Sequence, residues 1–172
     1  MHQESLDIMQ HYLEQIEKLL PAPISVLDVG SRRIGDIRDS STYHDLVSDK
    51  YNYVGLDVEA GNNVDIVVDE PYSWNITSQF DLVISGQAFE HIEFPWLTIC
   101  EIAKVLKPGG YVVIIVPTVP LIHRFPVDCW RILPDGLIAL AKWAKLDVIE
   151  ASINQYGEWG DAWCFLQKPF KA

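Results

Sequence analysis

Cysteine is scarce in this sequence, which has three in 172 residues. Cys100, Cys129 and Cys164 lie far apart, and no Cys-x-x-Cys spacing occurs. An odd number of well-separated cysteines argues against a disulfide framework and against a cysteine-ligated zinc site. We therefore expect free thiols in a reducing compartment and no metal centre.

Basic residues are also few, since 13 Lys and Arg stand against 24 Asp and Glu, which gives a net charge of −11. A chain this acidic is repelled by phosphate backbones and by anionic lipid, so we expect neither nucleic acid nor a membrane as a partner. Long apolar runs are missing as well. The first 20 residues interleave charges with apolar side chains, unlike a signal peptide or a transmembrane span, and we expect a cytoplasmic protein.

What the sequence does contain is typical of a single domain over residues 1–172, with 49% hydrophobic and 22% charged residues. Apolar residues recur at helical spacing in residues 1–20, and Pro21 and Pro23 end this N-terminal helix. The other predicted helices cover residues 42–50, 95–106 and 134–145. The predicted strands cover residues 24–29, 51–58, 64–68, 80–85, 111–116, 147–153 and 162–167.

Most of these strands are near-continuous runs of Val, Ile and Leu, as in FDLVIS and YVVIIV, which indicates burial on both faces. We therefore predict the α/β class, with a doubly wound, mostly parallel seven-stranded sheet and helices on both faces. In such sheets ligands bind beyond the carboxyl ends of the strands. The residues that follow each strand are therefore the informative ones.

Small and acidic residues stand at four of those strand ends. They are Gly30 after the first predicted strand, Asp57 in the second, Asp69 and Glu70 after the third, and Ser85 and Gly86 at the fourth. Each of them alone is also explained by a turn or by a helix cap. Their occurrence in this order favours a ligand site.

Five segments carry a family resemblance: VLDVGS, YVGLDV, VDEPY, FDLVISGQAFEHIEFP and EIAKVLKPGGYVVIIVP. Over residues 26–117 they resemble the class I S-adenosylmethionine-dependent methyltransferases, in particular the small type-11-like group. The resemblance implies a Rossmann-like methyltransferase fold, S-adenosylmethionine as cofactor and S-adenosylhomocysteine as product. Residues 123–137 are similar to a segment of methyltransferases linked with sugar or surface-polysaccharide biosynthesis, which implies a glycan-type acceptor.

The resemblance also implies roles for the strand-end residues. The methionine part of the cofactor would contact Asp28, Gly30 and the adjacent Ser31, and its ribose hydroxyls would bind Asp57. The adenine amino group would bind Asp69, with the Glu70 backbone beside it, and the sulfonium side would face Ser85 and Gly86. The family's glycine-rich motif is altered, because Arg32 and Ile34 stand where two glycines are usual. Arg32 also disfavours a dinucleotide fingerprint, in which that position must let a pyrophosphate approach the backbone.

Residues 118–133 are the predicted acceptor-side segment, because polar and aromatic residues gather there without a core pattern. We expect His123 to act as the base that takes a proton from an acceptor hydroxyl, with His91 and Asp128 as alternative catalytic residues. A structural role is left open, in which Asp128 pairs with the arginines of the segment to form a lid.

The predicted reaction is methyl transfer to a small polar or glycan-type acceptor, with oxygen as the favoured atom. The chain has no inserted capping domain, so we expect the acceptor wall to come from the N-terminal helix, from residues 118–133 or from a second copy of the chain in a homo-oligomer. Two other functions stay open. One is a non-catalytic, methyltransferase-like binding or scaffolding protein, which the altered glycine motif favours, and the other is a nicotinamide-dependent oxidoreductase, which Arg32 disfavours.

Overall fold

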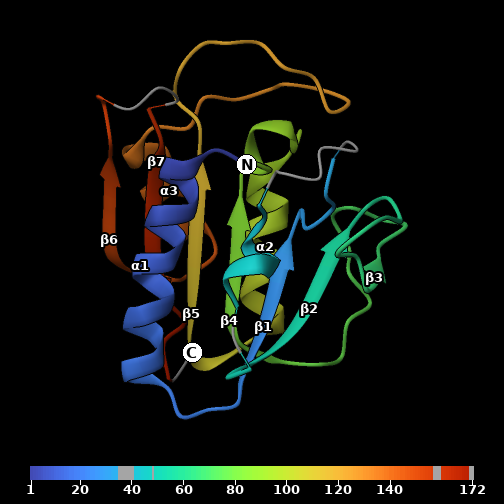
Figure 1. Ribbon diagram of the computed structural model, residues 1–172, viewed down its shortest axis with the longest axis vertical. Helices are drawn as coiled ribbons and strands as arrows, with labels where there is room; N and C mark the ends of the chain where they lie inside the picture. Colours follow the sequence, from blue (N-terminus) through green and yellow to red (C-terminus); the bar gives the residue numbers. More distant parts are fainter. Residues whose placement is uncertain (35–40, 48, 157–159, 171–172) are drawn as a thin grey trace.

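The computed structural model describes residues 1–34, 41–47, 49–156 and 160–170. Within these ranges the strands form one seven-stranded sheet in the order β3-β2-β1-β4-β5-β7-β6 (Figure 1). The strands are β1 (Ile24–Val29), β2 (Tyr51–Asp57), β3 (Ile66–Val67), β4 (Phe80–Gly86), β5 (Leu106–Val116), β6 (Asp147–Ile153) and β7 (Ala162–Gln167). The helices are α1 (Gln3–Leu19), α2 (Pro95–Val105) and α3 (Pro134–Trp143), with the short 3-10 helices η1 (Tyr43–Leu46) and η2 (Phe89–His91).

Strand direction changes only at the β7 side of the sheet. The strands from β3 to β5 pair in parallel, whereas β7 runs antiparallel to both of its neighbours, β5 and β6. The chain moves outward from β1 to β2 and β3, and then returns to place β4 on the other side of β1. The predicted doubly wound, mostly parallel sheet is confirmed, and its switch in strand order lies between β1 and β4.

Alternate residues of the same strands face two separate cores. On one face, Met9 and Ile16 of α1 pack with Val113 and Ile115 of β5. On the other face, α2 and α3 pack against neighbouring residues such as Val112. Figure 1 shows α1 in front of the sheet and α2 and α3 behind it. Burial on both faces explains why the strands read as unbroken apolar runs.

Three predicted elements differ substantially in extent from those observed, whereas the ends of the others agree within two residues. The predicted strand at 64–68 is only the two residues of β3, because it lies at the sheet edge and the Val67 side chain is exposed. The predicted helix at 42–50 is the single turn of η1, which buries Tyr43 under α1. Strand β5 begins at Leu106, earlier than expected, because Gly109 adopts φ +80 and its N–H bonds to the carbonyl of Lys168 (2.9 Å).

The carboxyl ends of β1, β2, β4 and β5 point to the same edge of the sheet, at the top of Figure 1. The connection from β5 to α3 arches over that edge. Among the described residues, no helix combines the length and hydrophobicity that a membrane crossing needs.

Candidate active site

Two adjoining cavities open at the carboxyl edge of the sheet. The first has a volume of about 290 Å³ and lies across the switch between β1 and β4. Its wall comes from the ends of β1 and β2 and from the segments that follow β3, β4 and β5. The ends of β1 and β2 contribute Gly30, Leu56, Asp57 and Val58, and the segment after β3 contributes Val68, Pro71, Tyr72 and Trp74. The segment after β4 contributes Ala88, Ile92 and Glu93, and the segment after β5 contributes Phe125, Pro126 and Val127. The second is lined by the start of the chain, by Arg33, Thr42 and Gly86, and by His123.

The wall between the two cavities is shared. Gly30, Arg32, Ile34, Gln87, His91 and Phe125 line both of them. A ligand in the first cavity can therefore present one of its groups to a ligand in the second. This arrangement suits a transfer between two bound molecules.

At Gly30 the backbone after β1 packs directly against the chain after β4. Its φ is +81, and a Cβ atom built there would lie 2.5 Å from the Cβ of Ala88. Any side chain would therefore both strain the backbone and collide with its neighbour. The sequence reasoning placed this glycine in the cofactor cradle, and the structure places it on the wall of both cavities.

Asp57 ends β2 with its carboxylate on the wall of the first cavity. One oxygen accepts the backbone N–H of Arg32 (3.1 Å), and the other accepts that of Glu59 (3.2 Å). The same carboxylate thus fixes the loops that follow β1 and β2. Arg32, which replaces the expected second glycine, pairs with Glu59 at 2.9 Å on the rim.

Three of the other predicted cofactor residues lie behind the cavity wall rather than on it. Asp28 is buried and accepts a hydrogen bond from the Tyr53 hydroxyl (2.7 Å), and burial raises its pKa to about 7. The Ser85 hydroxyl donates to the carbonyl of Val29 (2.7 Å), while Ser31 is buried beside the shared wall. None of the three lines either cavity.

The acidic pair after β3 also lies outside the first cavity. Asp69 and Glu70 are exposed, and their neighbours Val68 and Pro71 form the wall instead. Gly86, by contrast, does line the second cavity. A Cβ atom there would lie 2.0 Å from the Tyr43 hydroxyl oxygen, so glycine is required by the packing of that ring.

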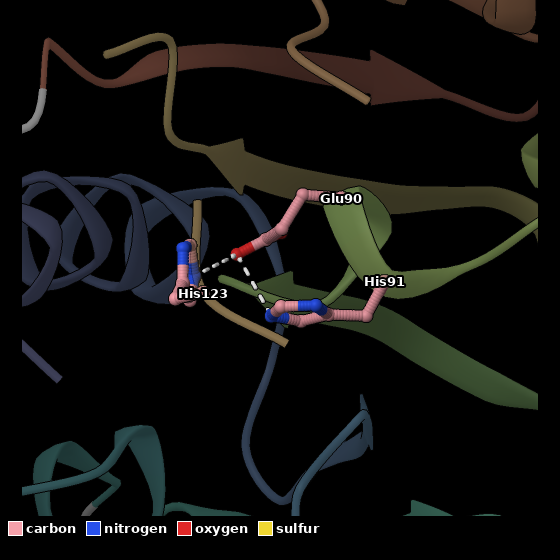
Figure 2. A group of neighbouring side chains, drawn as sticks. All are labelled: Glu90, His91 and His123. Atoms are coloured by element: carbon pink, nitrogen blue, oxygen red, sulfur yellow. Dashed lines mark ion pairs between the residues drawn. The ribbon is translucent and has the colours of Figure 1, made fainter. Parts of the chain in front are cut away.

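A carboxylate and two imidazoles meet beside the shared wall (Figure 2). Glu90 belongs to η2 and is 0% exposed. Its Oε1 lies 3.5 Å from Nε2 of His91 and 3.6 Å from Nε2 of His123, and neither carboxylate oxygen has a hydrogen bond. Burial raises the pKa of Glu90 to about 8 and lowers that of His91.

The sequence reasoning named both histidines as candidates but missed Glu90. The signal that could have found it is the Glu-His pair directly after β4, at the edge where ligands bind. His123 comes from the connection after β5, more than thirty positions later. Only the fold brings it to the pair.

Asp128 fastens the connection after β5 instead of lining a cavity. Its carboxylate accepts two hydrogen bonds from Arg131 (2.5 and 2.9 Å) and one from the backbone N–H of His123 (2.7 Å). The Arg131 guanidinium holds the pKa of Asp128 below its usual range. Asp128 thus pairs with an arginine of the same segment, as in the structural role that was left open, and it positions the backbone of His123.

The start of the chain, which the sequence offered as one source of the acceptor site, contributes to the second cavity. Met1 and His2 line the second cavity. Nε2 of His2 lies 2.6 Å from the buried carboxylate of Asp161, which also accepts a hydrogen bond from the Gln87 amide (3.1 Å). This network ties α1 to the loop after β4 and to the start of β7.

Comparison with known proteins agrees with this geometry. Residues 44–114 match the family model described as a methyltransferase domain. No curated protein sequence matches the chain. Among solved structures, an S-adenosylmethionine-dependent methyltransferase from Methanosarcina mazei superposes with a TM-score of 0.66 at 15% identity, over 91% of this chain and 98% of that one.

Two further structures have ligands named with them. The N-methyltransferase NodS from Bradyrhizobium japonicum, in complex with S-adenosyl-L-homocysteine, superposes with a TM-score of 0.63 at 12% identity, over 95% of this chain and 87% of that one. Magnesium protoporphyrin IX methyltransferase from Synechocystis, also with bound S-adenosylhomocysteine, gives 0.68 at 13% identity, over 97% and 83%.

The fold of the chain is that of the class I methyltransferases, with the Rossmann-like sheet that this class shares. Residues 44–114 are the part of the chain that matches the methyltransferase-domain family model. Both findings confirm the resemblance seen in the sequence.

Proposed function

We propose that this protein is a methyltransferase that moves a methyl group from S-adenosylmethionine to an oxygen of a small polar or glycan-type acceptor. One observation carries the proposal: two cavities share a wall at the switch point of a methyltransferase fold. The first would hold the cofactor and the second the acceptor. The reacting atoms would then meet beside Gln87 and His91.

The first cavity suits the cofactor chemically. Leu56, Val68 and Trp74 offer apolar and aromatic surface for an adenine ring. The Asp57 carboxylate is a charged acceptor for two ribose hydroxyls, at the strand end where such a group is expected. Gly30 lets the methionine part approach the backbone, because a side chain there would fill the space.

When bound, the cofactor supplies a methyl group on a cationic sulfonium. Carboxylates and aromatic faces near the cavity favour that charge. Asp28, Ser31 and Ser85 would act from behind the wall, by holding the ends of β1 and β4 in place. Asp69 and Glu70 would reach an adenine amino group only from the rim of the cavity.

The second cavity favours a polar acceptor because its wall carries His2, Arg33, Thr42 and His123. Transfer forms an oxygen–methyl bond and breaks the sulfur–methyl bond, and the hydroxyl proton must leave. His123 can take it at Nε2, since its Nδ1 lies 3.1 Å from the Leu121 carbonyl, which only accepts. A second copy of the chain as an additional acceptor wall stays a proposal, as does a cytoplasmic location.

Calorimetric titration tests the proposal. S-adenosylmethionine and S-adenosylhomocysteine should bind one per chain with micromolar or tighter affinity, and labelled cofactor should then transfer its methyl group to members of a panel of hydroxylated and sugar acceptors. Absence of binding at millimolar cofactor would overturn the proposal in favour of a scaffolding protein, which the Arg32 substitution also fits. Binding of NADH in its place would indicate an oxidoreductase.

A further inference from the structure

We propose that Glu90, His91 and His123 bind a divalent transition-metal ion at the wall of the acceptor cavity. This group consists of two imidazoles and a carboxylate, and it differs from the cysteine-ligated zinc site that the sequence argues against. All three donor atoms lie within 4.8 Å of one another. Figure 2 shows both rings turned with a nitrogen toward the same carboxylate oxygen.

The distances fit ligands that share one ion. Bonds of about 2.0–2.2 Å to zinc at the tetrahedral angle place neighbouring donor atoms roughly 3.4 Å apart. Oε1 of Glu90 lies 3.5 and 3.6 Å from the two Nε2 atoms. Direct hydrogen bonds between the same groups would be shorter, near 2.7–2.9 Å.

The opposite edge of each ring is held in the way that metal-ligating histidines usually are. Nδ1 of His91 lies 2.6 Å from the Val127 carbonyl, and Nδ1 of His123 lies 3.1 Å from the Leu121 carbonyl. A carbonyl oxygen only accepts, so each Nδ1 carries the hydrogen. In the neutral ring Nε2 then presents a lone pair toward Glu90, and the carbonyl on the other side of the ring fixes its orientation.

The burial of Glu90 is the independent observation. Among the described residues, Glu90 alone has two buried carboxylate oxygens without any hydrogen bond. Burying a carboxylate in this way costs free energy unless a cation or a set of donors compensates it. Imidazole lone pairs at 3.5 and 3.6 Å supply neither a proton nor a positive charge to the carboxylate, whereas a divalent cation between the three groups would hold Glu90 in its ionised form.

Another group of possible ligands among the described residues has no space for an ion between its donor atoms. His2, Glu4 and Asp161 also lie close together. The His2 Nε2 atom, however, is only 2.6 Å from the Asp161 carboxylate, which is a direct hydrogen bond that leaves no room for an ion. The proposal therefore applies to the Glu90 group alone.

The donor set selects the type of metal. Two imidazoles and one carboxylate suit zinc, iron, cobalt or nickel better than magnesium or calcium, which prefer all-oxygen sites. Three protein ligands also leave a coordination position open, as in catalytic zinc sites. Because His91 and His123 both line the acceptor cavity, the open position faces that cavity.

The role of the ion in catalysis rests on the proposed function, although its binding does not. An acceptor hydroxyl bound at the open position would lose its proton to water in the cavity more readily, because a coordinated oxygen has a lowered pKa. The metal would then replace His123 as the activating group, since one Nε2 atom cannot be both ligand and base.

The test uses the full chain after removal of metals with EDTA and dialysis. Zn²⁺ titrated by calorimetry should bind one per chain, and Co²⁺ should give the intense visible absorption of a four-coordinate site. Glu90→Gln and His123→Ala should each weaken Zn²⁺ binding by at least about 10-fold. His11→Ala removes an exposed histidine of α1 and is the matched control, with unchanged affinity.

Circular dichroism shows whether each variant is folded, and Glu90→Gln keeps the size of the side chain if His123→Ala does not fold. Zn²⁺ affinity that is weaker than about 100 μM, or that is the same in wild type and Glu90→Gln, overturns the site. Cofactor binding is measured separately in EDTA. Zn²⁺ binding without cofactor binding would retain the site and reject the proposed function, and the reverse result would reject the site only.

Discussion

Replacing Asp57 by alanine should weaken S-adenosylmethionine binding by about 1.5–3 kcal/mol, because hydrogen bonds to a charged group are worth that much. At about 1.4 kcal/mol per factor of ten, the dissociation constant should rise about 10- to 150-fold. The carboxylate also accepts the backbone N–H groups of Arg32 and Glu59. Its loss therefore loosens the two loops that line the cavity, which places the expected effect toward the upper end.

Calorimetry on three variants separates these contributions. Asp57→Asn keeps the shape and one acceptor oxygen but loses the charge, so its affinity should lie between those of wild type and Asp57→Ala. Asp147→Asn removes one negative charge at the exposed start of β6 and should bind as wild type does. If folded Asp57→Ala binds the cofactor within twofold of wild type, Asp57 does not hold the ribose and the cofactor placement is wrong.

Three further outcomes follow from the same structure. Gly30→Val should abolish cofactor binding and lower the melting temperature. Its φ is +81, which costs a branched side chain about 1–3 kcal/mol of backbone strain, and its Cβ atom would lie 2.5 Å from that of Ala88. Calorimetry and thermal unfolding check this, and an unchanged cofactor affinity would mean that Gly30 is not part of the cofactor site. His123→Ala should cut turnover by about 10²–10⁴-fold and leave cofactor affinity within a few-fold. Kinetics with an identified acceptor check it, and a raised Michaelis constant with turnover within threefold would instead indicate a lid. Asp28, whose pKa burial raises to about 7, binds a proton in the native state that the unfolded chain releases near pH 4, so its contribution to stability should fall as pH rises from 4 to 7. The urea midpoint of Asp28→Asn should therefore gain on that of wild type between pH 5 and 7.5, whereas parallel curves would contradict the shift.

Local patterns in the sequence are sufficient to predict most of the helices and strands of the fold. The runs ISVLDV, FDLVIS and YVVIIV predict strands because both of their faces are buried, and they form β1, β4 and the greater part of β5. The strand-end rule then placed Gly30 and Asp57 on the cavity wall, since a parallel sheet gathers its carboxyl ends at one edge.

Features that depend on distant segments were not predictable in the same way. The burial of Glu90 requires the connection after β5 to fold back and bring His123 to it, a contact between segments more than thirty residues apart. The roles of Asp69 and Glu70 came from the family resemblance, and the very short β3 leaves both exposed. The pairing of Asp128 with Arg131 is local, and the sequence did indicate it as an alternative.

The composition of the cavity wall links ligand binding to folding. Gly30, Asp57, Gln87 and Val127 follow or end four different strands, so the cavity forms only when β1, β2, β4 and β5 lie side by side in the folded sheet. A ligand that binds there is released whenever the domain unfolds, and at 100 times its dissociation constant it adds about 2.7 kcal/mol to the free energy of unfolding. For a domain of this length that corresponds to roughly 5–10 °C in melting temperature. A melting curve can therefore serve as a titration, in which unknown acceptors are ranked by the heat resistance they confer on the cofactor-bound protein.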